Sequence, residues 1–219
     1  MKKLATGAAA AKDVLPITAD PGSFRARLRA DILTIALGIM TREGLDAVQA
    51  RRVAVDAGCS VGTIYNIFGG LDGLIIAVNS ETLALMGGEL RAVYEATREL
   101  STPERLTALA LAYMNFAFSH RARWSAIFEH RLPPGKSLPE DYDASRAELL
   151  ALLARAIGSG RAKPDVGLRA ARSLFAATHG IITLALDNKM SPFDPAVVEA
   201  DIRFIVTAAA RGLDEAERD

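Results

Sequence analysis

Apolar residues recur along most of the chain at spacings of three and four positions, which is the period of an α-helix. Near the N-terminus, Leu28, Ile32, Ile35 and Ile39 share one helical face in this way. No segment shows the strict alternation of apolar and polar residues that a half-buried β-strand requires. The composition agrees, because aromatic residues, which favour strands, make up only 6% of the chain. The pattern therefore predicts an all-α fold.

Capping and turn residues divide this pattern into separate helices. Ser23 can cap the first helix and Gly44 can end it, while Ser101 and Pro103 mark a later start. The pair Gly87-Gly88 lies inside the longest segment, where it predicts a kink or a break. We expect helices at residues 24–42, 49–56, 60–66, 71–100, 102–120, 121–130, 140–157, 165–187 and 194–212.

Two short helices, at 49–56 and 60–66, carry the clearest functional signal. Helices of about two turns are unstable alone because nucleation is costly, so these must pack on each other and on the first helix. Gly58 allows the positive φ that a tight turn needs, and Ser60 is a natural N-cap for the second helix. The residues on the outer face of that helix are small and nearly uncharged, which suits the major groove of DNA. They are Val61, Gly62, Thr63, Tyr65 and Asn66.

Residues 24–80 resemble the N-terminal domain of the TetR family of transcriptional regulators. The shared pattern comprises Val53-Ala54, the run from Ala57 to Tyr65, and then Phe68 and Leu74. The resemblance implies a helix-turn-helix domain in which Tyr65 contacts the phosphate backbone and Phe68 packs the domain together. It also implies a repressor that a small-molecule effector releases from a palindromic operator in double-stranded DNA. The candidate DNA contacts are Gln49, Arg51, Arg52, Ser60, Val61, Gly62, Thr63, Tyr65 and Asn66.

Three positions depart from the family pattern, and each departure removes a phosphate contact. The family commonly has Lys where this chain has Leu71, His or Tyr where it has Ile67, and Ser or Thr where it has Gln49. Residues 24–80 carry six arginines and five acidic residues, a low positive charge for a DNA-binding module. A helical ligand-binding protein that has lost specific DNA binding therefore remains the alternative. The candidate substitutes for phosphate contact are Arg51, Arg52 and the group Arg25, Arg27 and Arg29.

The remainder of the chain resembles the regulatory domain of the same family. Trp124 and the pair His179-Gly180 resemble a C-terminal subtype marked by such positions, the WHG subtype. The resemblance implies an effector site between helices and a dimer built from the last two long helices. Aromatic residues concentrate at 113–128, which favours a pocket there. The alternative is that these side chains belong to the hydrophobic core, which is the commoner case. A single histidine among apolar residues is also more often a buried side chain with a hydrogen-bond partner than a ligand-binding group. The candidate pocket residues are Tyr113, Phe116, Trp124, Phe128 and His179.

The last two long helices are apolar on more than one face. This is typical of a helix with one partner in its own chain and another across an interface. The alternative is a single-chain core. The interpretation divides the chain into a disordered tail at 1–23, a helix-turn-helix DNA-binding domain at 24–80, and an effector-binding and dimerisation domain at 81–219. The candidate residues of the homodimer interface are Leu174, Ile182, Leu186, Ile202 and Ile205.

Other classes of function lack their sequence signals. The chain shows no nucleophile with a base at a recognisable spacing, no phosphate-binding glycine loop and no metal motif, so we expect neither an enzyme nor a cofactor. The single Cys59 excludes an internal disulfide. Lys12 and Asp13 interrupt the apolar run near the N-terminus, and no segment is long enough to span a membrane, so we expect a cytoplasmic protein. The net charge of zero places any contact with nucleic acid on a local surface.

Overall fold

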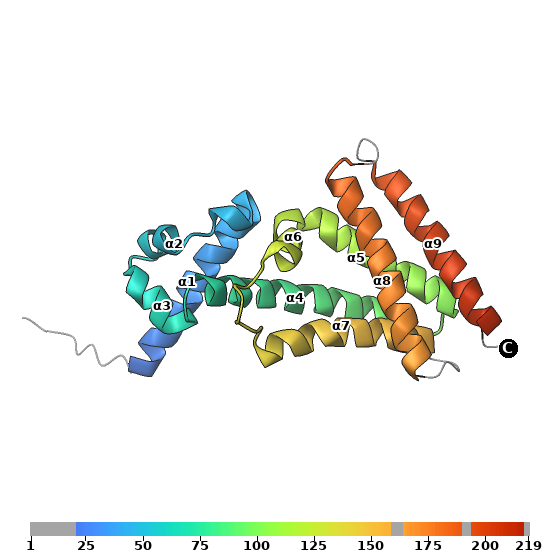
Figure 1. Ribbon diagram of the computed structural model, residues 1–219, viewed down its shortest axis with the longest axis horizontal. Coiled ribbons are helices and arrows are strands. Elements are labelled where there is room, and N and C mark those ends of the chain that lie inside the picture. Colours follow the sequence, from blue (N-terminus) through green and yellow to red (C-terminus); the bar gives the residue numbers. More distant parts are fainter. Residues whose placement is uncertain (1–20, 159–163, 190–193, 217–219) are drawn as a thin grey trace, which may run out of the picture.

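The computed structural model describes residues 21–158, 164–189 and 194–216, and every regular element in these ranges is helical (Figure 1). The prediction of an all-α fold is confirmed. Each α-helix lies within a few residues of a range predicted from the sequence, and one 3-10 turn, η1, is added. The elements are α1 (Pro21–Glu43), η1 (Leu45–Ala47), α2 (Ala50–Asp56), α3 (Val61–Phe68), α4 (Leu71–Ala96), α5 (Thr102–Ser119), α6 (Arg121–Glu129), α7 (Glu140–Gly158), α8 (Pro164–Leu186) and α9 (Pro195–Ala216).

Two parts of the predicted layout differ from the structure. Helix α4 runs unbroken through Gly87 and Gly88, and neither glycine has a positive φ, so the predicted break is absent. The predicted tail ends earlier than expected, because α1 already begins at Pro21, a residue type that suits the first turn of a helix. Residues 1–20, which make up most of that tail, lie outside the described part of the chain.

Two hydrophobic cores lie along the molecule and meet at α4. The smaller core packs α1, α2 and α3 against the first turns of α4, around Ile32, Val53 and Ile64. The larger core fills the bundle formed by α4 to α9. Helix α4 supplies Leu74 to the smaller core and Leu83 to the larger one. One continuous helix therefore joins the two cores, so a movement of α4 within the larger core also moves the part of α4 that lies in the smaller core.

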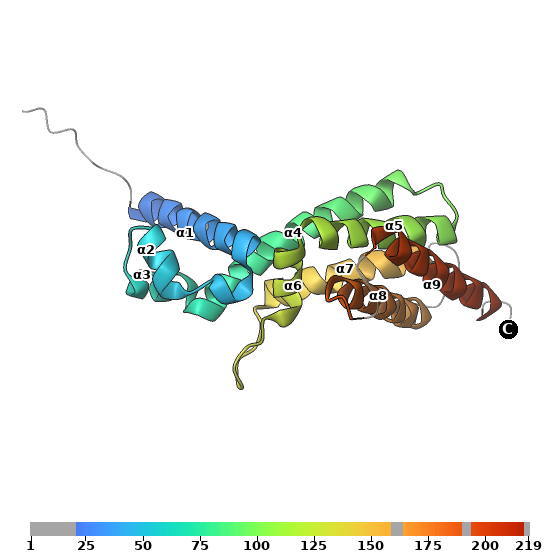
Figure 2. The ribbon, with the colours of Figure 1, turned by 90° about the horizontal axis from the view of Figure 1, so that it is seen from above.

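Helices α1 to α3 form one end of an elongated molecule, and the bundle forms the other (Figure 1 and Figure 2). Helices α4, α5 and α7 pack side by side along the long axis. Helix α8 packs on α7, and α9 packs on α5 and on α8, so both lie on the outside of the bundle. This position leaves each of them with a face turned away from the core.

Gly88 provides a test of the continuous α4. We expect Gly88→Ala to stabilise the protein by about 0.5–1 kcal/mol, because alanine loses less backbone freedom than glycine on entering a helix. Space is available, since a Cβ at Gly88 meets no atom within 4 Å. The midpoint of thermal unfolding, followed by circular dichroism, should rise by about 2 °C. A lower midpoint would show that this position needs glycine after all.

Candidate nucleic-acid interface and internal cavity

Helix α3 is held at both ends by its own sequence. At its start, Ser60 Oγ accepts the backbone N–H of Thr63 at 3.1 Å, which caps the helix. At its end, Gly69 has a φ of 77°, a left-handed conformation that favours glycine and closes the last turn. Between these ends, Ile64 is completely buried in the smaller core. These contacts fix which face of α3 points outward.

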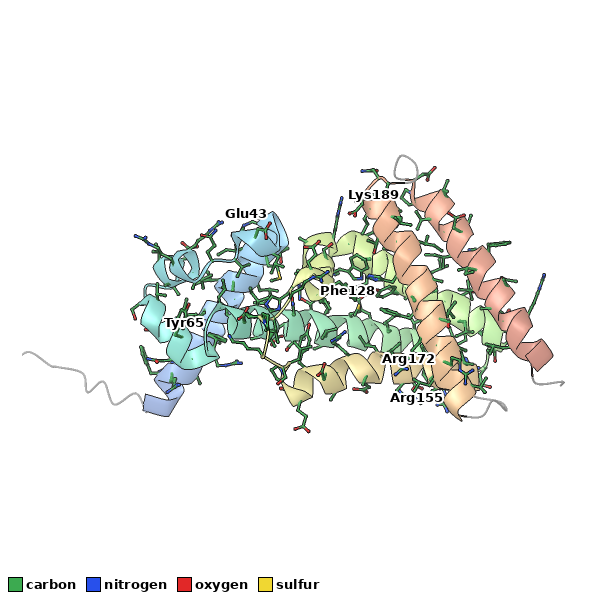
Figure 3. The ribbon with its side chains drawn as sticks, in the orientation of Figure 1. Glu43, Tyr65, Phe128, Arg155, Arg172 and Lys189 are labelled. Carbon is green, nitrogen blue, oxygen red and sulfur yellow. The ribbon has the colours of Figure 1, made fainter. Side chains whose placement is uncertain are left out.

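Most residues predicted to contact DNA lie on the surface of α2 and α3. Tyr65 lies on α3, at the end of the molecule away from the bundle, and 55% of its surface is exposed (Figure 3). Thr63 is half-buried, and its hydroxyl oxygen lies 2.9 Å from that of Ser60, so these two side chains pair with each other. The exposed members of the set are Gln49, Arg51, Ser60, Val61, Gly62, Tyr65 and Asn66.

Arg52 is already paired within the domain. Its two terminal nitrogens donate to the two carboxylate oxygens of Glu43 at 2.6 and 2.7 Å, which joins α2 to the end of α1. The hydrogen bonds between them lower the pKa of Glu43 and raise the pKa of Arg52. A contact between Arg52 and a DNA phosphate would have to compete with this ion pair.

Two arginines of α1 hold the end of α3. Arg25 Nη2 donates to the backbone carbonyl oxygen of Asn66 at 2.9 Å. The guanidinium of Arg29 lies 5.2 Å from the centre of the Phe68 ring, within the range of a cation–π contact. Both arginines therefore orient α3 as well as adding positive charge beside it.

A cluster that sequence reasoning missed ties the start of α4 to the bundle. Asp72 Oδ2 accepts a hydrogen bond from Lys136 Nζ at 3.1 Å, and Asp72 Oδ1 lies 3.3 Å from His130 Nε2. The hydrogen bond from Lys136, aided by that with His130, holds the pKa of Asp72 below its usual range, although partial burial opposes the shift. His130 and Lys136 are 58 and 64 positions from Asp72. No local pattern could therefore have shown the cluster.

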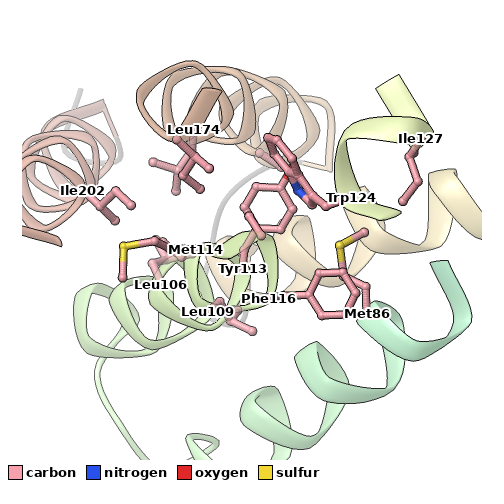
Figure 4. Close-up of a cluster of buried hydrophobic side chains, with 14 of the residues drawn as sticks. Met86, Leu106, Leu109, Tyr113, Met114, Phe116, Trp124, Ile127, Leu174 and Ile202 are labelled. Atoms are coloured by element: carbon pink, nitrogen blue, oxygen red, sulfur yellow. The ribbon is translucent and has the colours of Figure 1, made fainter. Parts of the chain in front are cut away.

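A cavity of about 400 Å³ lies inside the bundle, between α4, α5, α6, α7 and α8. Two of the five predicted pocket residues, Tyr113 and Phe128, line it. Phe116, Trp124 and His179 are outside the lining. Figure 4 shows Trp124 and Phe116 packed near Tyr113 in the larger core. Most of the lining is aliphatic, so the clustering of aromatic residues in the sequence does not mark the cavity.

His179 lies in an aromatic cluster beside the cavity. Its Nδ1 is 2.9 Å from the hydroxyl oxygen of Tyr113, and its ring centre lies 4.2 Å from that of Phe128 and 4.9 Å from that of Trp124. Burial lowers the pKa of His179 and raises the pKa of Tyr113, so both side chains are neutral at pH 7. The structure thus brings Trp124 and His179 together, while the WHG subtype stays a prediction.

The residues predicted for a dimer interface are mostly covered within the single chain. Ile182 and Ile202 are completely buried, Leu174 and Leu186 are buried, and Ile205 is half-buried. Leu174 also lines the cavity. Of the five, Ile205 keeps the most accessible surface for a second copy, and exposed neighbours on the same two helices join it as interface candidates. The large apolar residues exposed on the described parts of α8 and α9 are Leu168, Leu184, Val197 and Phe204.

Metal binding and membrane insertion each place requirements on the described ranges, residues 21–158, 164–189 and 194–216. No group of three or more His, Cys, Asp or Glu side chains in these ranges could hold a metal ion. No single described helix is long and apolar enough to cross a membrane, whereas α3 and α4 together, bent by 61°, meet that test of length and composition.

The known proteins that this chain resembles include transcriptional regulators. Residues 106–209 match the family described as tetracyclin repressor-like, C-terminal domain. An uncharacterized HTH-type transcriptional regulator of Mycobacterium tuberculosis is 25% identical over 174 residues, which cover 80% of this chain and 77% of the relative.

Solved structures show the same fold. A possible TetR family transcriptional regulator from Streptomyces coelicolor has a TM-score of 0.64 at 18% identity, and the match covers 86% of this chain and 99% of that one. A TetR variant from Acinetobacter baumannii in complex with minocycline has a TM-score of 0.59 at 16% identity, with 91% of this chain and 98% of that one covered.

Proposed function

Because the chain belongs to the TetR family of transcriptional regulators, we propose that it is a repressor that binds a palindromic operator as a homodimer and leaves it when a small molecule enters the bundle. The observation that carries this proposal is the outward face of α3, where Tyr65 is exposed while its neighbour Ile64 is completely buried. A short helix anchored in this way presents polar side chains at a fixed angle, as reading a major groove requires. Its place of action is the cytoplasm, where bacterial DNA lies.

The cavity is the proposed effector site. Its volume falls within the range of small-molecule sites, and its mainly apolar walls with a few polar groups are typical of them. Tyr113 and Phe128 are the two predicted pocket residues that line it. The minocycline bound to the similar protein from Acinetobacter baumannii supports a ligand site in this fold.

Two contacts connect the cavity to the proposed DNA-binding end. Asn79 Nδ2 of α4 donates to the backbone oxygen of Ala126 in α6 at 3.1 Å, and His130 at the end of α6 contacts Asp72 at the start of α4. Phe128, which lies between these two contacts in α6, lines the cavity. A molecule that displaces α6 therefore also displaces α4, and with it the angle of α3 relative to DNA.

The proposed homodimer forms through the exposed side of α8 and α9. Val197 and Phe204 are seven positions apart, so they lie on the same face of α9. A two-fold axis through this surface would present two copies of α3 to two half-sites of a palindrome.

A second candidate function, a helical ligand-binding protein without specific DNA binding, is favoured by the charge at the start of α4. Leu71 stands where the family commonly has Lys, and the next residue, Asp72, is acidic. Arg52, a candidate substitute, is paired with Glu43. These features reduce the positive charge available for phosphates.

A gel-shift experiment with the DNA that flanks the gene of this protein separates the two functions. The repressor predicts a shift that is specific for sequence and that weakens steeply with added salt. A purified dimer that binds no flanking DNA more tightly than unrelated DNA would establish the second candidate instead.

Tyr65→Phe tests the contact between α3 and the DNA backbone. We expect operator affinity to fall about tenfold to hundredfold, because the variant loses a hydroxyl that donates to a charged phosphate. Tyr94→Phe is the matched control, since Tyr94 lies in α4 and packs against the larger core. Equal affinities for Tyr65→Phe and the unmodified protein in a gel-shift titration would remove Tyr65 from the contact surface.

A further inference from the structure

The cavity wall is dominated by aliphatic side chains from every helix around it. Leu83 and Met86 come from α4, Leu109 from α5, and Leu152 from α7. Apolar walls favour apolar ligand surface, because burying such surface releases it from water. The body of a fitting molecule is therefore hydrocarbon-like.

Charged side chains line the cavity only at its opening, as far as the described residues show. These are Asp143 and Arg146 of α7, whose side chains are 58% and 51% exposed and lie 3.5 Å apart as an ion pair. Phe128 of α6, which is partly exposed, also lines the cavity. A charge carried deeper into the cavity would meet no opposite charge, and burying an unpaired charge is costly.

Thr178 provides an unpartnered polar group inside the cavity. It is only 4% exposed and lines the wall, and its Oγ1 has no hydrogen-bond partner. Other helical threonines, such as Thr82 and Thr107, donate to the carbonyl oxygen four residues earlier, at 3.2 and 2.8 Å. A buried hydroxyl without a partner is unfavourable, so the Thr178 hydroxyl would gain from a ligand group that can bond to it.

The other buried polar side chain that lines the cavity, Tyr113, already has a hydrogen-bond partner. The Tyr113 hydroxyl is hydrogen-bonded to His179 at 2.9 Å, and both side chains are neutral because burial disfavours their charged forms. The cavity therefore offers one free hydroxyl and no buried charge along its described walls.

We propose that the cavity selects a neutral, mainly apolar molecule with one hydroxyl-type group, which hydrogen-bonds to Thr178 while its hydrocarbon body fills the space between α4, α5 and α7. The proposal deepens the proposed function, on which it rests in taking the cavity as the effector site. The cavity distinguishes an alcohol from the matching carboxylate or ammonium ion because its interior holds no opposite charge that could pair with either ion.

The test uses the full-length protein and three probes with the same hydrocarbon chain: decanol, decanoate and decylammonium. Binding is measured at pH 7 by calorimetry and by the fluorescence of Trp124, the only tryptophan of the chain, which contacts Tyr113 and Phe128. Decanol should bind at least about tenfold more tightly than either ion. Absence of decanol binding, or equal or tighter binding of either ion, would overturn the proposal.

Thr178→Val removes the hydroxyl while nearly keeping the shape of the side chain. It should weaken decanol binding about threefold to tenfold. Thr183→Val is the matched control, because Thr183 lies in the same helix, also has a buried hydroxyl without a partner, and does not line the cavity. Equal effects of the two variants, or no effect of Thr178→Val, would overturn the role of Thr178.

These measurements are made without DNA, so they are independent of the gel shift. Decanol binding with the predicted Thr178 dependence, in a protein that binds no operator, would support this inference and reject the proposed function. A specific gel shift in a protein that does not bind decanol would reject this inference and leave the proposed function standing.

Discussion

Gly73→Ala is expected to destabilise the proposed DNA-binding end by about 3 kcal/mol. Gly73 lies in the first turn of α4, where an added Cβ would be 1.8 Å from the carbonyl oxygen of Phe68 and 2.9 Å from its carbonyl carbon. Phe68 is the last residue of α3, and its backbone cannot rotate aside as a side chain can. The clash therefore forces α3 away from α4 and disturbs the packing of Ile64 in the smaller core.

Urea denaturation followed by circular dichroism measures the loss, and hydrogen exchange locates it. Amides of α3 should exchange faster in the variant, while those of α8, which packs in the larger core, should change little. Gly88→Ala is the matched control, because it is the same change in the same helix at a position with open space. If Gly73→Ala were as stable as the unmodified protein, with unchanged exchange in α3, the close approach of Phe68 and Gly73 would not exist in solution.

The local features of the helix-turn-helix could be predicted from the sequence because each depends on neighbours along the chain. Ser60 caps α3 as predicted, since a side chain needs only the backbone three residues later. Tyr65 is exposed, as predicted for the outer face of this helix, because helical period alone decides which residues share a face. Gly73 was missed although its role is local, because the close approach depends on the angle between α3 and α4, which composition does not reveal.

Contacts between distant segments could not be predicted in the same way. The pairing of Asp72 with Lys136 depends on how the loop before α7 returns to α4. The burial of most predicted interface residues within the single chain could not be predicted, for a related reason. A helix with apolar residues on several faces does not show which face its own chain covers, and the structure covers Ile182 and Ile202 while Phe204 stays exposed.

Phe204→Glu is expected to convert the proposed dimer into a monomer. Phe204 is 75% exposed on α9, an unusual position for a large aromatic side chain unless another surface covers it. Burying a phenylalanine stabilises a contact by about 1.5–3 kcal/mol, and a two-fold symmetric interface contains this residue twice, once from each subunit. The dissociation constant of the dimer should therefore rise at least about hundredfold, which sedimentation velocity over a range of protein concentrations measures.

Val55→Glu provides the matched control, because Val55 is 72% exposed but lies on α2, at the other end of the molecule. This variant should stay dimeric. The two substitutions add the same charge to equally exposed apolar positions, so a general effect of charge would appear in both. Helical content should be unchanged in both, since neither side chain contributes to a buried core. A Phe204→Glu protein that sediments as a dimer would move the interface away from this face of α9, and the geometry proposed for the two copies of α3 on a palindrome would need another two-fold axis.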